Sequence, residues 1–345
     1  DRSVSRGLGD VYKRQILLGV VCISLLPVSV HAQKYTEFIP GEVWKDTDGN
    51  PINAHGGGLL YHNGTYYWYG EYKKGKTILP DWATWECYRT DVTGVGCYSS
   101  KDLLNWKFEG IVLPAVKDDP NHDLHPSKVL ERPKVVYNKK TGKFVMWAHV
   151  ESADYSKACA GVAVSDSPVG PFVYQGSFRP NNAMSRDQTV FVDDDGRAYQ
   201  FYSSENNETM YISLLTDDYL KPSGRFTRNF VKESREAPAV FKYNGKYYLS
   251  YSDNHDENWN DGVKGDNRMR YAVSDSPLGP WESKGIYMEP TDSYTNHGSI
   301  VEFKGQWYSF YHNSALSGHD WLRSICVDKL YYNPDGTIKM VKQTK

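Results

Sequence analysis

One phrase occurs five times in this chain of 345 residues: a short apolar strand, a turn that contains glycine, and an aromatic strand. The copies run over 55–71, 131–149, 187–203, 236–252 and 296–312. In the fourth copy Asn244-Gly245 is a strong signal for a tight hairpin, because the turn needs positive φ. Units of about 40 to 50 residues with four strands each are typical of propeller blades. A β-sandwich does not predict five copies of one phrase, so we expect an all-β fold, a five-bladed β-propeller.

The repeat also predicts where a functional site lies. Equivalent positions on the innermost strands of a propeller converge on its axis, and each copy of the phrase begins with such a position. Counting back from the turn glycine of each copy gives the axial set His55, Glu131, Asp187, Glu236 and Asn296, with His297 beside the last. Three carboxylates that face one funnel repel one another and lose solvation, which raises at least one pKa. Acid–base chemistry on a neutral polar substrate is the usual reason for such an arrangement.

The beginning of the chain has a different character from the repeats. Residues 1–15 show no apolar periodicity and resemble translated adapter sequence, although a basic n-region is the alternative. An apolar run over 16–30 is interrupted by Pro27 and is too short to span a bilayer. It is followed by a small-residue cleavage pattern that ends at Ala32. We therefore expect a leader and signal peptide over 1–32, a propeller domain over 33–345, and a periplasmic or extracellular protein with no membrane segment after cleavage.

Charge and cysteine usage exclude some classes of partner. The net charge is −2 and no basic cluster is present, which argues against nucleic acid. The cysteines of the mature chain lack metal-ligand spacing, and a Cys87–Cys97 disulfide is one alternative for two of them. The polar insertion over 73–96 either shapes the binding site or decorates the surface. We expect a monomer.

Several motifs resemble glycoside hydrolase family 43 over essentially the whole mature chain. RDQTVFVDDDGRAYQFYSS resembles its aspartate-strand motif, REAPAVFKYNGKYYLSYS its general-acid motif, and NHGSIVEFKGQWYSFYHNS with RSICVDKLYYNPDGTI its last blade. The part up to about Ser252 is similar to the exo-β-1,3-galactosidase branch, with which it shares AHG-x-G, YYW-x-GE and ERPKV. The part from about Asn254 is more similar to the arabinofuranosidase and xylosidase branches.

The resemblance implies roles for the axial residues. Glu236 would be the general acid, and Asp187 would orient it and keep its pKa high. Glu131 would bind substrate together with His55, Asn296, His297 and Trp68. The usual family base, an Asp followed by Pro on the first blade, is replaced by Gly56. The glutamine that holds the attacking water in the galactosidase branch is also absent, which leaves the base unassigned.

The function that the resemblance implies is that of a secreted, exo-acting, inverting glycosidase acting on plant cell-wall oligo- or polysaccharide. A β-galactosyl substrate is favoured, and α-L-arabinofuranoside or β-xyloside is the alternative. A different class of protein, a carbohydrate-binding propeller without catalysis, is suggested by the missing base. Such an enzyme requires no cofactor, and the resemblance allows for a calcium ion near His297.

Overall fold

The computed structural model describes residues 34–74, 92–233, 235–252, 268–288, 298–313 and 324–343. The expected leader, signal peptide and cleavage position lie outside these residues. So do Asn296 and His297, two members of the axial set. In the part of the chain that is described, no helix is long and apolar enough to cross a membrane.

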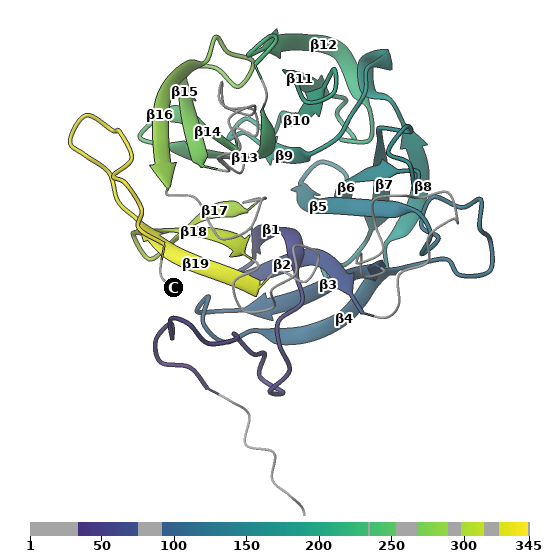
Figure 1. Cartoon of the computed structure of the whole chain (residues 1–345), viewed down its shortest axis with the longest axis horizontal. Coiled ribbons are helices and arrows are strands. Elements are labelled where there is room, and N and C mark those ends of the chain that lie inside the picture. Colours follow the sequence, from purple (N-terminus) through teal and green to yellow (C-terminus); the bar gives the residue numbers. More distant parts are fainter. Residues whose placement is uncertain are drawn as a thin grey trace, which may run out of the picture. The chain divides into compact units, whose positions relative to one another are not determined.

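Within the described ranges the strands form five antiparallel sheets around a common axis, and in each sheet neighbours in sequence are neighbours in space (Figure 1). This arrangement confirms the predicted five-bladed β-propeller. Blade 1 comprises β1 (His55–His62), β2 (Thr65–Lys73), β3 (Val92–Ser100) and β4 (Lys107–Pro114). Blade 2 comprises β5 (Val129–Asn138), β6 (Lys143–Glu151), β7 (Cys159–Ser165) and β8 (Val173–Phe178). Blade 3 comprises β9 (Gln188–Val192), β10 (Ala198–Ser204), β11 (Thr209–Leu215), β12 (Pro222–Asn229), and a 3-10 turn, η1 (Pro180–Asn182), precedes it. Blade 4 comprises β13 (Glu236–Tyr243), β14 (Lys246–Ser252), β15 (Met269–Ser274) and β16 (Glu282–Met288). Blade 5 comprises β17 (Ser299–Phe303), β18 (Gln306–Asn313) and β19 (Ser324–Leu330).

Tight turns join the first two strands of the blades, as the sequence predicts. Both Asn244 (φ 48°) and Gly245 (φ 77°) have the positive φ that a primed turn demands. The same pair of conformations occurs at Asn63 and Gly64 in blade 1. These turns fix the pairing register, so the first residue of the phrase pairs with its last in blades 1, 2 and 4.

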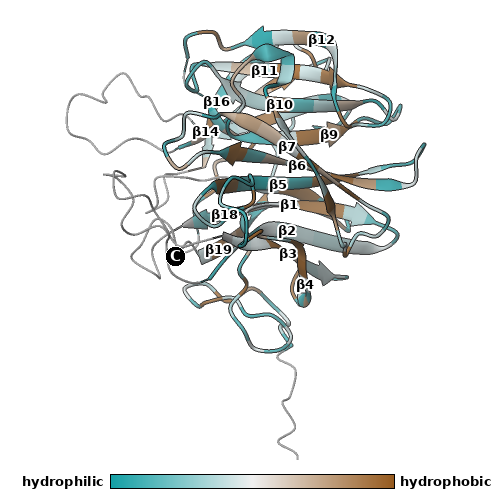
Figure 2. Ribbon diagram, turned by 90° about the vertical axis from the view of Figure 1, so that its right-hand side faces the viewer, coloured by the Kyte–Doolittle hydropathy of each residue, from teal (hydrophilic) through white to brown (hydrophobic). Residues whose placement is uncertain are grey.

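The hydrophobic core is divided into layers between adjacent blades. The described residues contain five buried clusters, and each draws its members from two neighbouring blades. Between blades 3 and 4, for example, Phe201 and Ile212 pack with Leu249 and Tyr251. Figure 2 shows hydrophobic residues along the strands and mostly hydrophilic residues in the connecting loops. Because the inner strands of the blades are covered on both faces, strands such as β6 and β10 are buried along almost their whole length, whereas the outer strand β12 is mostly exposed.

Aromatic packing closes the ring between blades 5 and 1. Trp68 of β2 is 2% exposed, and its ring lies 5.1 Å from that of Trp106 and 5.2 Å from that of Phe310 on β18. Tyr66 donates a hydrogen bond to the backbone oxygen of Glu302 at 2.6 Å. Trp68 therefore stabilises the closure and is not placed to stack on a substrate, contrary to the sequence expectation. Cys97 is a buried free thiol in β3, and its considered partner Cys87 lies outside the described residues.

Candidate active site

Four members of the axial set lie where an innermost strand begins. His55 and Glu236 are the first residues of β1 and β13, Glu131 is the third residue of β5, and Asp187 directly precedes β9. His55, Glu131 and Asp187 are buried, and Glu236 is partly exposed. The structure therefore brings these side chains to the same end of the propeller axis.

A bulge follows the axial residue in blades 1, 2 and 4. The strand register shifts after His55, Glu131 and Glu236, and the next residue has positive φ: Gly56 at 55°, Arg132 at 55° and Ala237 at 53°. For a residue other than glycine such a conformation costs on the order of 1–3 kcal/mol and persists only when the surroundings enforce it. Backbone hydrogen bonds provide that constraint at two of the three bulges.

Both of these hydrogen bonds run from the bulge to a carboxylate of the preceding blade. Arg132 N donates to Glu71 Oε1 at 3.0 Å, and Ala237 N donates to Asp187 Oδ2 at 3.1 Å. The side chain of Arg132 adds to this link, because its Nε donates to Asp187 Oδ1 at 2.9 Å and its Nη1 lies 3.6 Å from Glu71 Oε1. Arg132 therefore connects blades 1, 2 and 3 around the axis.

The same ion pair occupies the space beside Gly56, the residue that stands where the resemblance places the usual base. A Cβ atom at Gly56 would lie 2.5 Å from Glu71 Oε1 and 2.9 Å from Arg132 Nη1. Both distances are far below van der Waals contact. The space that a side chain at position 56 would need is thus filled by the Glu71–Arg132 pair.

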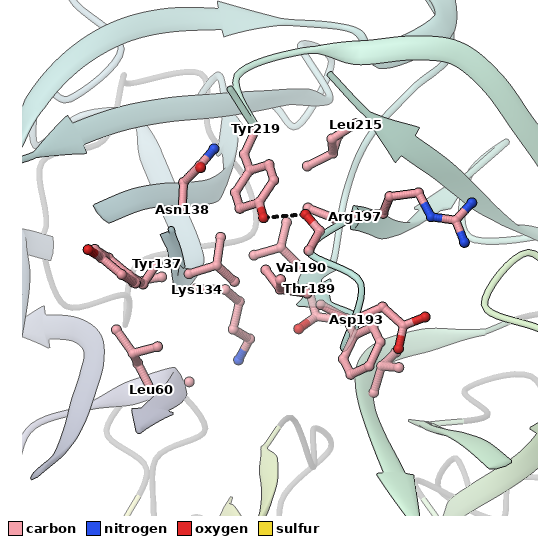
Figure 3. A pocket seen from close by; sticks show the side chains of 18 of the residues that line it. Leu60, Lys134, Tyr137, Asn138, Thr189, Val190, Asp193, Arg197, Leu215 and Tyr219 are labelled. Atoms are coloured by element: carbon pink, nitrogen blue, oxygen red, sulfur yellow. Dashed lines mark hydrogen bonds between the residues drawn. The ribbon is translucent and has the colours of Figure 1, made fainter. Parts of the chain in front are cut away.

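Lys134 lies beneath the site. Its Nζ donates to the backbone oxygens of Gly56, at 3.0 Å, and of Gly57. Burial lowers the pKa of this amine well below its usual value. The Lys134 side chain also lines a cavity of about 870 Å³ at the opposite end of the axis, together with Asp193 and Tyr219 (Figure 3). Lys134 therefore separates that cavity from the candidate site.

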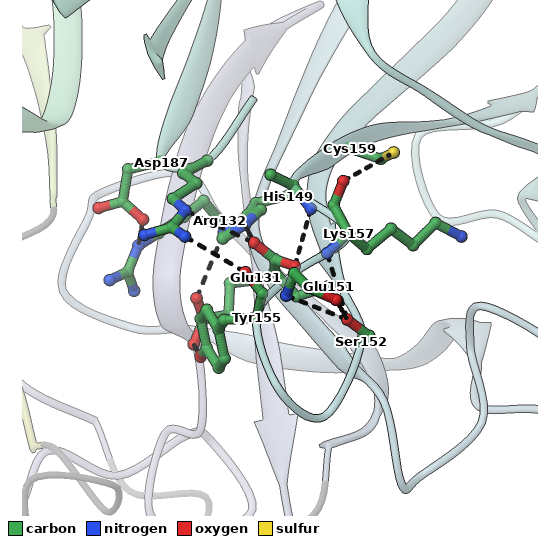
Figure 4. A network of polar contacts seen from close by, with 12 residues as sticks. Glu131, Arg132, His149, Glu151, Ser152, Tyr155, Lys157, Cys159 and Asp187 are labelled. Atoms are coloured by element: carbon green, nitrogen blue, oxygen red, sulfur yellow. Dashed lines mark hydrogen bonds and ion pairs between the residues drawn. The ribbon is translucent and has the colours of Figure 1, made fainter. Parts of the chain in front are cut away.

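A buried polar network surrounds Glu131 (Figure 4). Tyr155, on the connection between β6 and β7, donates its hydroxyl hydrogen bond to Glu131 Oε1 at 3.0 Å. His149 lies between two carboxylates: Nδ1 is 3.4 Å from Glu131 Oε2, and Nε2 is 3.3 Å from Glu151 Oε1. Burial by itself would raise the pKa of Glu131. The contact with His149 and the charges of Arg132 and His149 outweigh burial and hold this pKa well below its usual value.

Glu236 is in the opposite electrostatic state. Burial of its carboxyl group, followed by the negative charge of Asp187, raises its pKa to about 8. Asn207 donates a hydrogen bond from its amide nitrogen to Glu236 Oε1. The site therefore contains one carboxylic acid that keeps its proton at neutral pH and ionised carboxylates beside it. Separated pKa values of this kind mark a site in which one carboxyl group can serve as a proton donor.

A metal ion does not fit the closest group of candidate ligands among the described residues. Atoms of Glu131, His149 and Asp187 lie within 4.8 Å of one another. However, both oxygens of Asp187 already accept hydrogen bonds, Oδ1 from Arg132 Nε and Oδ2 from Ala237 N, and the Arg132 guanidinium places a positive charge beside the group. The expected ion contact at His297 lies outside the described residues.

Aligning the five copies of the phrase identified the axial residues but missed two polar residues, Glu71 and His149, that pair with them on the neighbouring strand. His55 pairs with Glu71 and Glu131 with His149 on the neighbouring strands β2 and β6. These partners are the last residues of the first two copies of the phrase, so the repeat itself contained the signal. The role of Arg132 could not be predicted for a different reason. A bulge with positive φ turns its side chain toward the axis, and such a bulge has no sequence signature unless the residue is glycine.

Comparisons with known proteins agree with this geometry. The model of the glycosyl hydrolases family 43 matches residues 59–338. A solved family 43 β-1,3-galactosidase with galactodeoxynojirimycin is 34% identical, with a TM-score of 0.74, and the match covers 89% of this chain and 99% of that one. An exo-β-1,3-galactanase from Phanerochaete chrysosporium, solved with galactose, is 31% identical with a TM-score of 0.74 and coverage of 88% and 66%.

A curated relative has a different described activity. The β-xylosidase of Xylanibacter ruminicola is 34% identical over 222 residues, which are 53% of this chain and 66% of the relative. This chain thus spans just under two thirds of the length of that relative. The structural likeness extends over more of the chain than the sequence likeness to the xylosidase does.

Proposed function

Because the chain belongs to the glycosyl hydrolases of family 43 and is therefore a glycosidase, we propose that it is an exo-acting, inverting enzyme that removes terminal β-galactosyl units from a plant cell-wall polysaccharide. The observation that carries the acid–base part is the pKa of about 8 at Glu236 beside Asp187. At neutral pH Glu236 holds the proton that a leaving glycosidic oxygen needs.

In this mechanism each described side chain has a defined task. Glu236 protonates the leaving oxygen, and Asn207 orients its carboxyl group. Glu131 stays ionised and accepts hydrogen bonds from the hydroxyl groups of the terminal sugar. Arg132 offers positive charge beside both carboxylates and holds Asp187 at 2.9 Å. An inverting enzyme also needs a water on the far face of the sugar, with the second group ~6.5–9.5 Å from the acid.

The galactosyl preference rests on the first blade. Gly56 and the Glu71–Arg132 pair take up the position where most of the family carries its base, and the chain is similar over 89% of its length to a β-1,3-galactosidase. The runner-up is a β-xylosidase or α-L-arabinofuranosidase, which the likeness to the Xylanibacter ruminicola enzyme favours. A binding propeller without catalysis would have no need for an acid with a raised pKa.

A direct screen tests the proposal. The mature chain from residue 33 would be assayed on the nitrophenyl glycosides of β-galactose, α-L-arabinofuranose and β-xylose, with 1,3-galactan and arabinan beside them. We expect galactose release from the non-reducing end of 1,3-galactan, with the first product in the inverted configuration by NMR. Exclusive release of xylose or arabinose would mean that the substrate is a xyloside or an arabinofuranoside instead of a β-galactoside. No hydrolysis of any of the five substrates would contradict the catalytic proposal.

Export, metal use and assembly follow as further parts of the proposal. The apolar run before Ala32 supports secretion, and cleavage there is checked by mass spectrometry of the protein recovered from a secreting host. We propose a monomer that requires no metal. Activity unchanged by a chelator and a mass of one chain by light scattering are the expected results.

A further inference from the structure

The position of His149 between two carboxylates decides its charge. Its side chain is fully enclosed, and each ring nitrogen lies within 3.4 Å of a carboxylate oxygen, Glu131 on one side and Glu151 on the other. A neutral imidazole has one N–H and one lone pair, so one of its nitrogens would turn a lone pair toward an anion. Only the imidazolium turns an N–H toward both carboxylates, with Nε2 in a hydrogen bond to Glu151 and Nδ1 at ion-pair distance from Glu131.

The groups around His149 hold Glu151 in place as the second anion. Glu151 is 1% exposed, accepts a hydrogen bond from Ala158 N at 2.8 Å, and lies 3.6 Å from Arg186 Nε. Tyr155 packs edge-on to the His149 ring at 6.2 Å. On the third strand of the blade, β7, the residue paired with His149 is Ala160, which carries no charge.

His149 lies within a group of buried charges. The ion pairs around the site join the carboxylates Glu71, Glu131, Glu151 and Asp187 to Lys73, Arg132, His149 and Arg186, and the buried amine of Lys134 lies beside them. A neutral His149 would leave the carboxylates of Glu131 and Glu151 without the cation between them, which is costly in a buried setting.

We propose that His149, held as an imidazolium between Glu131 and Glu151, is a positioning residue that fixes Glu131 as the ionised carboxylate of the site, while Glu236 is the protonated one. This rests on the proposed function, since it concerns the same carboxylates. In addition, a histidine with no contact to the sugar determines that the substrate-binding carboxyl group is ionised, while the acid is protonated. Burial would lower the pKa of His149, but its contacts with Glu131 and Glu151 raise it to about 9, which agrees with the geometry.

The first test does not depend on any substrate. In protein with ¹⁵N-labelled histidine, the ring signals that disappear in His149→Gln belong to His149. We expect both nitrogens to be protonated at pH 7.5 and to lose a proton only near pH 9. In Glu151→Gln, which leaves the Glu131 contact in place, we expect that loss at lower pH. Neutral ring signals at pH 7.5 in the wild type would overturn the proposal, whatever the enzyme hydrolyses.

The second test uses the pH dependence of kcat/KM on whichever nitrophenyl glycoside is cleaved. Loss of an opposite charge within ~4–6 Å raises a carboxyl pKa by ~1–3 units. His149→Gln should therefore move the acid limb to higher pH by that amount and raise KM, while the alkaline limb set by Glu236 stays in place. His62→Gln, at the far end of β1, is the matched control and should move neither limb. A loss of activity in His149→Gln with an unmoved acid limb would mean a merely structural role and would refute the assignment.

Discussion

Arg132 Nε lies 2.9 Å from Oδ1 of Asp187, while Oδ2 of the same carboxylate accepts the backbone N–H of Ala237, next to Glu236. Asp187 thus acts on Glu236 in two ways. It fixes the left-handed bulge that follows the acid, and its negative charge discourages ionisation of the acid. Arg132 limits the second effect, because its charge lowers the pKa of Glu236 that burial and Asp187 raise.

Replacing Asp187 by Asn should separate these two effects. The amide oxygen still accepts a hydrogen bond, but the charge that helps to raise the pKa of Glu236 is lost. We expect a lower kcat and an alkaline limb of the pH profile that moves down from about 8. Asp193→Asn is a matched control, because Asp193 is also buried and hydrogen-bonded, to Tyr247 and Lys242, but at the other end of the axis. Equal shifts in both variants would contradict the role of Asp187.

The raised pKa of Glu236 also predicts how stability depends on pH. A carboxyl group whose folded pKa is above its unfolded value of ~4.3 binds a proton more tightly in the folded state. Its contribution is complete below ~4.3 and is lost as pH rises through about 8. Glu236→Gln cannot ionise, so its stability relative to the wild type should increase over that window. Denaturant unfolding at pH 5, 7 and 9 measures this, and a constant difference would contradict the shift.

Glu236→Gln should also distinguish leaving groups. General acid assistance is worth typically ~10²–10⁴-fold when the leaving group is poor, and much less when it is a good one. We expect almost complete loss on a galactan oligosaccharide and a much smaller loss on an activated aryl glycoside. The ratio of kcat/KM on the two substrates is the measurement. An equal loss on both would assign Glu236 to binding.

Gly56 should not tolerate the side chain that the family usually has at this position. Ala at position 56 would bring a Cβ to 2.5 Å from Glu71 Oε1 and would retain an unfavourable φ of 55°. Gly64 also has positive φ but has nothing within 4 Å of its Cβ position. We expect Gly64→Ala to cost only ~1–2 kcal/mol of stability, the left-handed penalty. Gly56→Ala should cost clearly more and disrupt the Glu71–Arg132 pair, and similar costs in the two variants would argue against the steric explanation.

The sequence predicted the parts of this molecule that depend on repetition. Five copies of one phrase predict five blades, and Asn244-Gly245 predicts its turn because few residues accept positive φ. The axial residues follow from the same alignment. Trp68 could not be assigned in this way, because in a propeller both faces of a strand are buried and alternation no longer separates core from surface. Its burial among Trp106 and Phe310 depends on how blade 5 meets blade 1.

Substitution of Trp68 is therefore expected to lower the stability of the fold and not the affinity for substrate. Its removal leaves a cavity in a packed aromatic layer, and Trp-to-Ala changes in cores cost ~3–5 kcal/mol. Trp68→Phe, which leaves a smaller void, should cost less and keep KM unchanged. Thermal unfolding and the KM of Trp68→Phe are the two measurements. A raised KM without loss of stability would restore Trp68 to the substrate-binding residues.

The last prediction concerns the attacking water. Gly56 offers no base, and Glu131 is a poor one, since its pKa is held well below the usual carboxyl value. We expect that Glu131→Ala loses activity mainly through KM, and that no single residue behaves as a strong base. Azide rescue of alanine variants at His55, Glu131 and His297 tests this. A base variant is rescued because azide replaces the activated water and gives a glycosyl azide of inverted configuration. We expect no such product from any of the three, and its formation in one variant alone would identify that residue as the base.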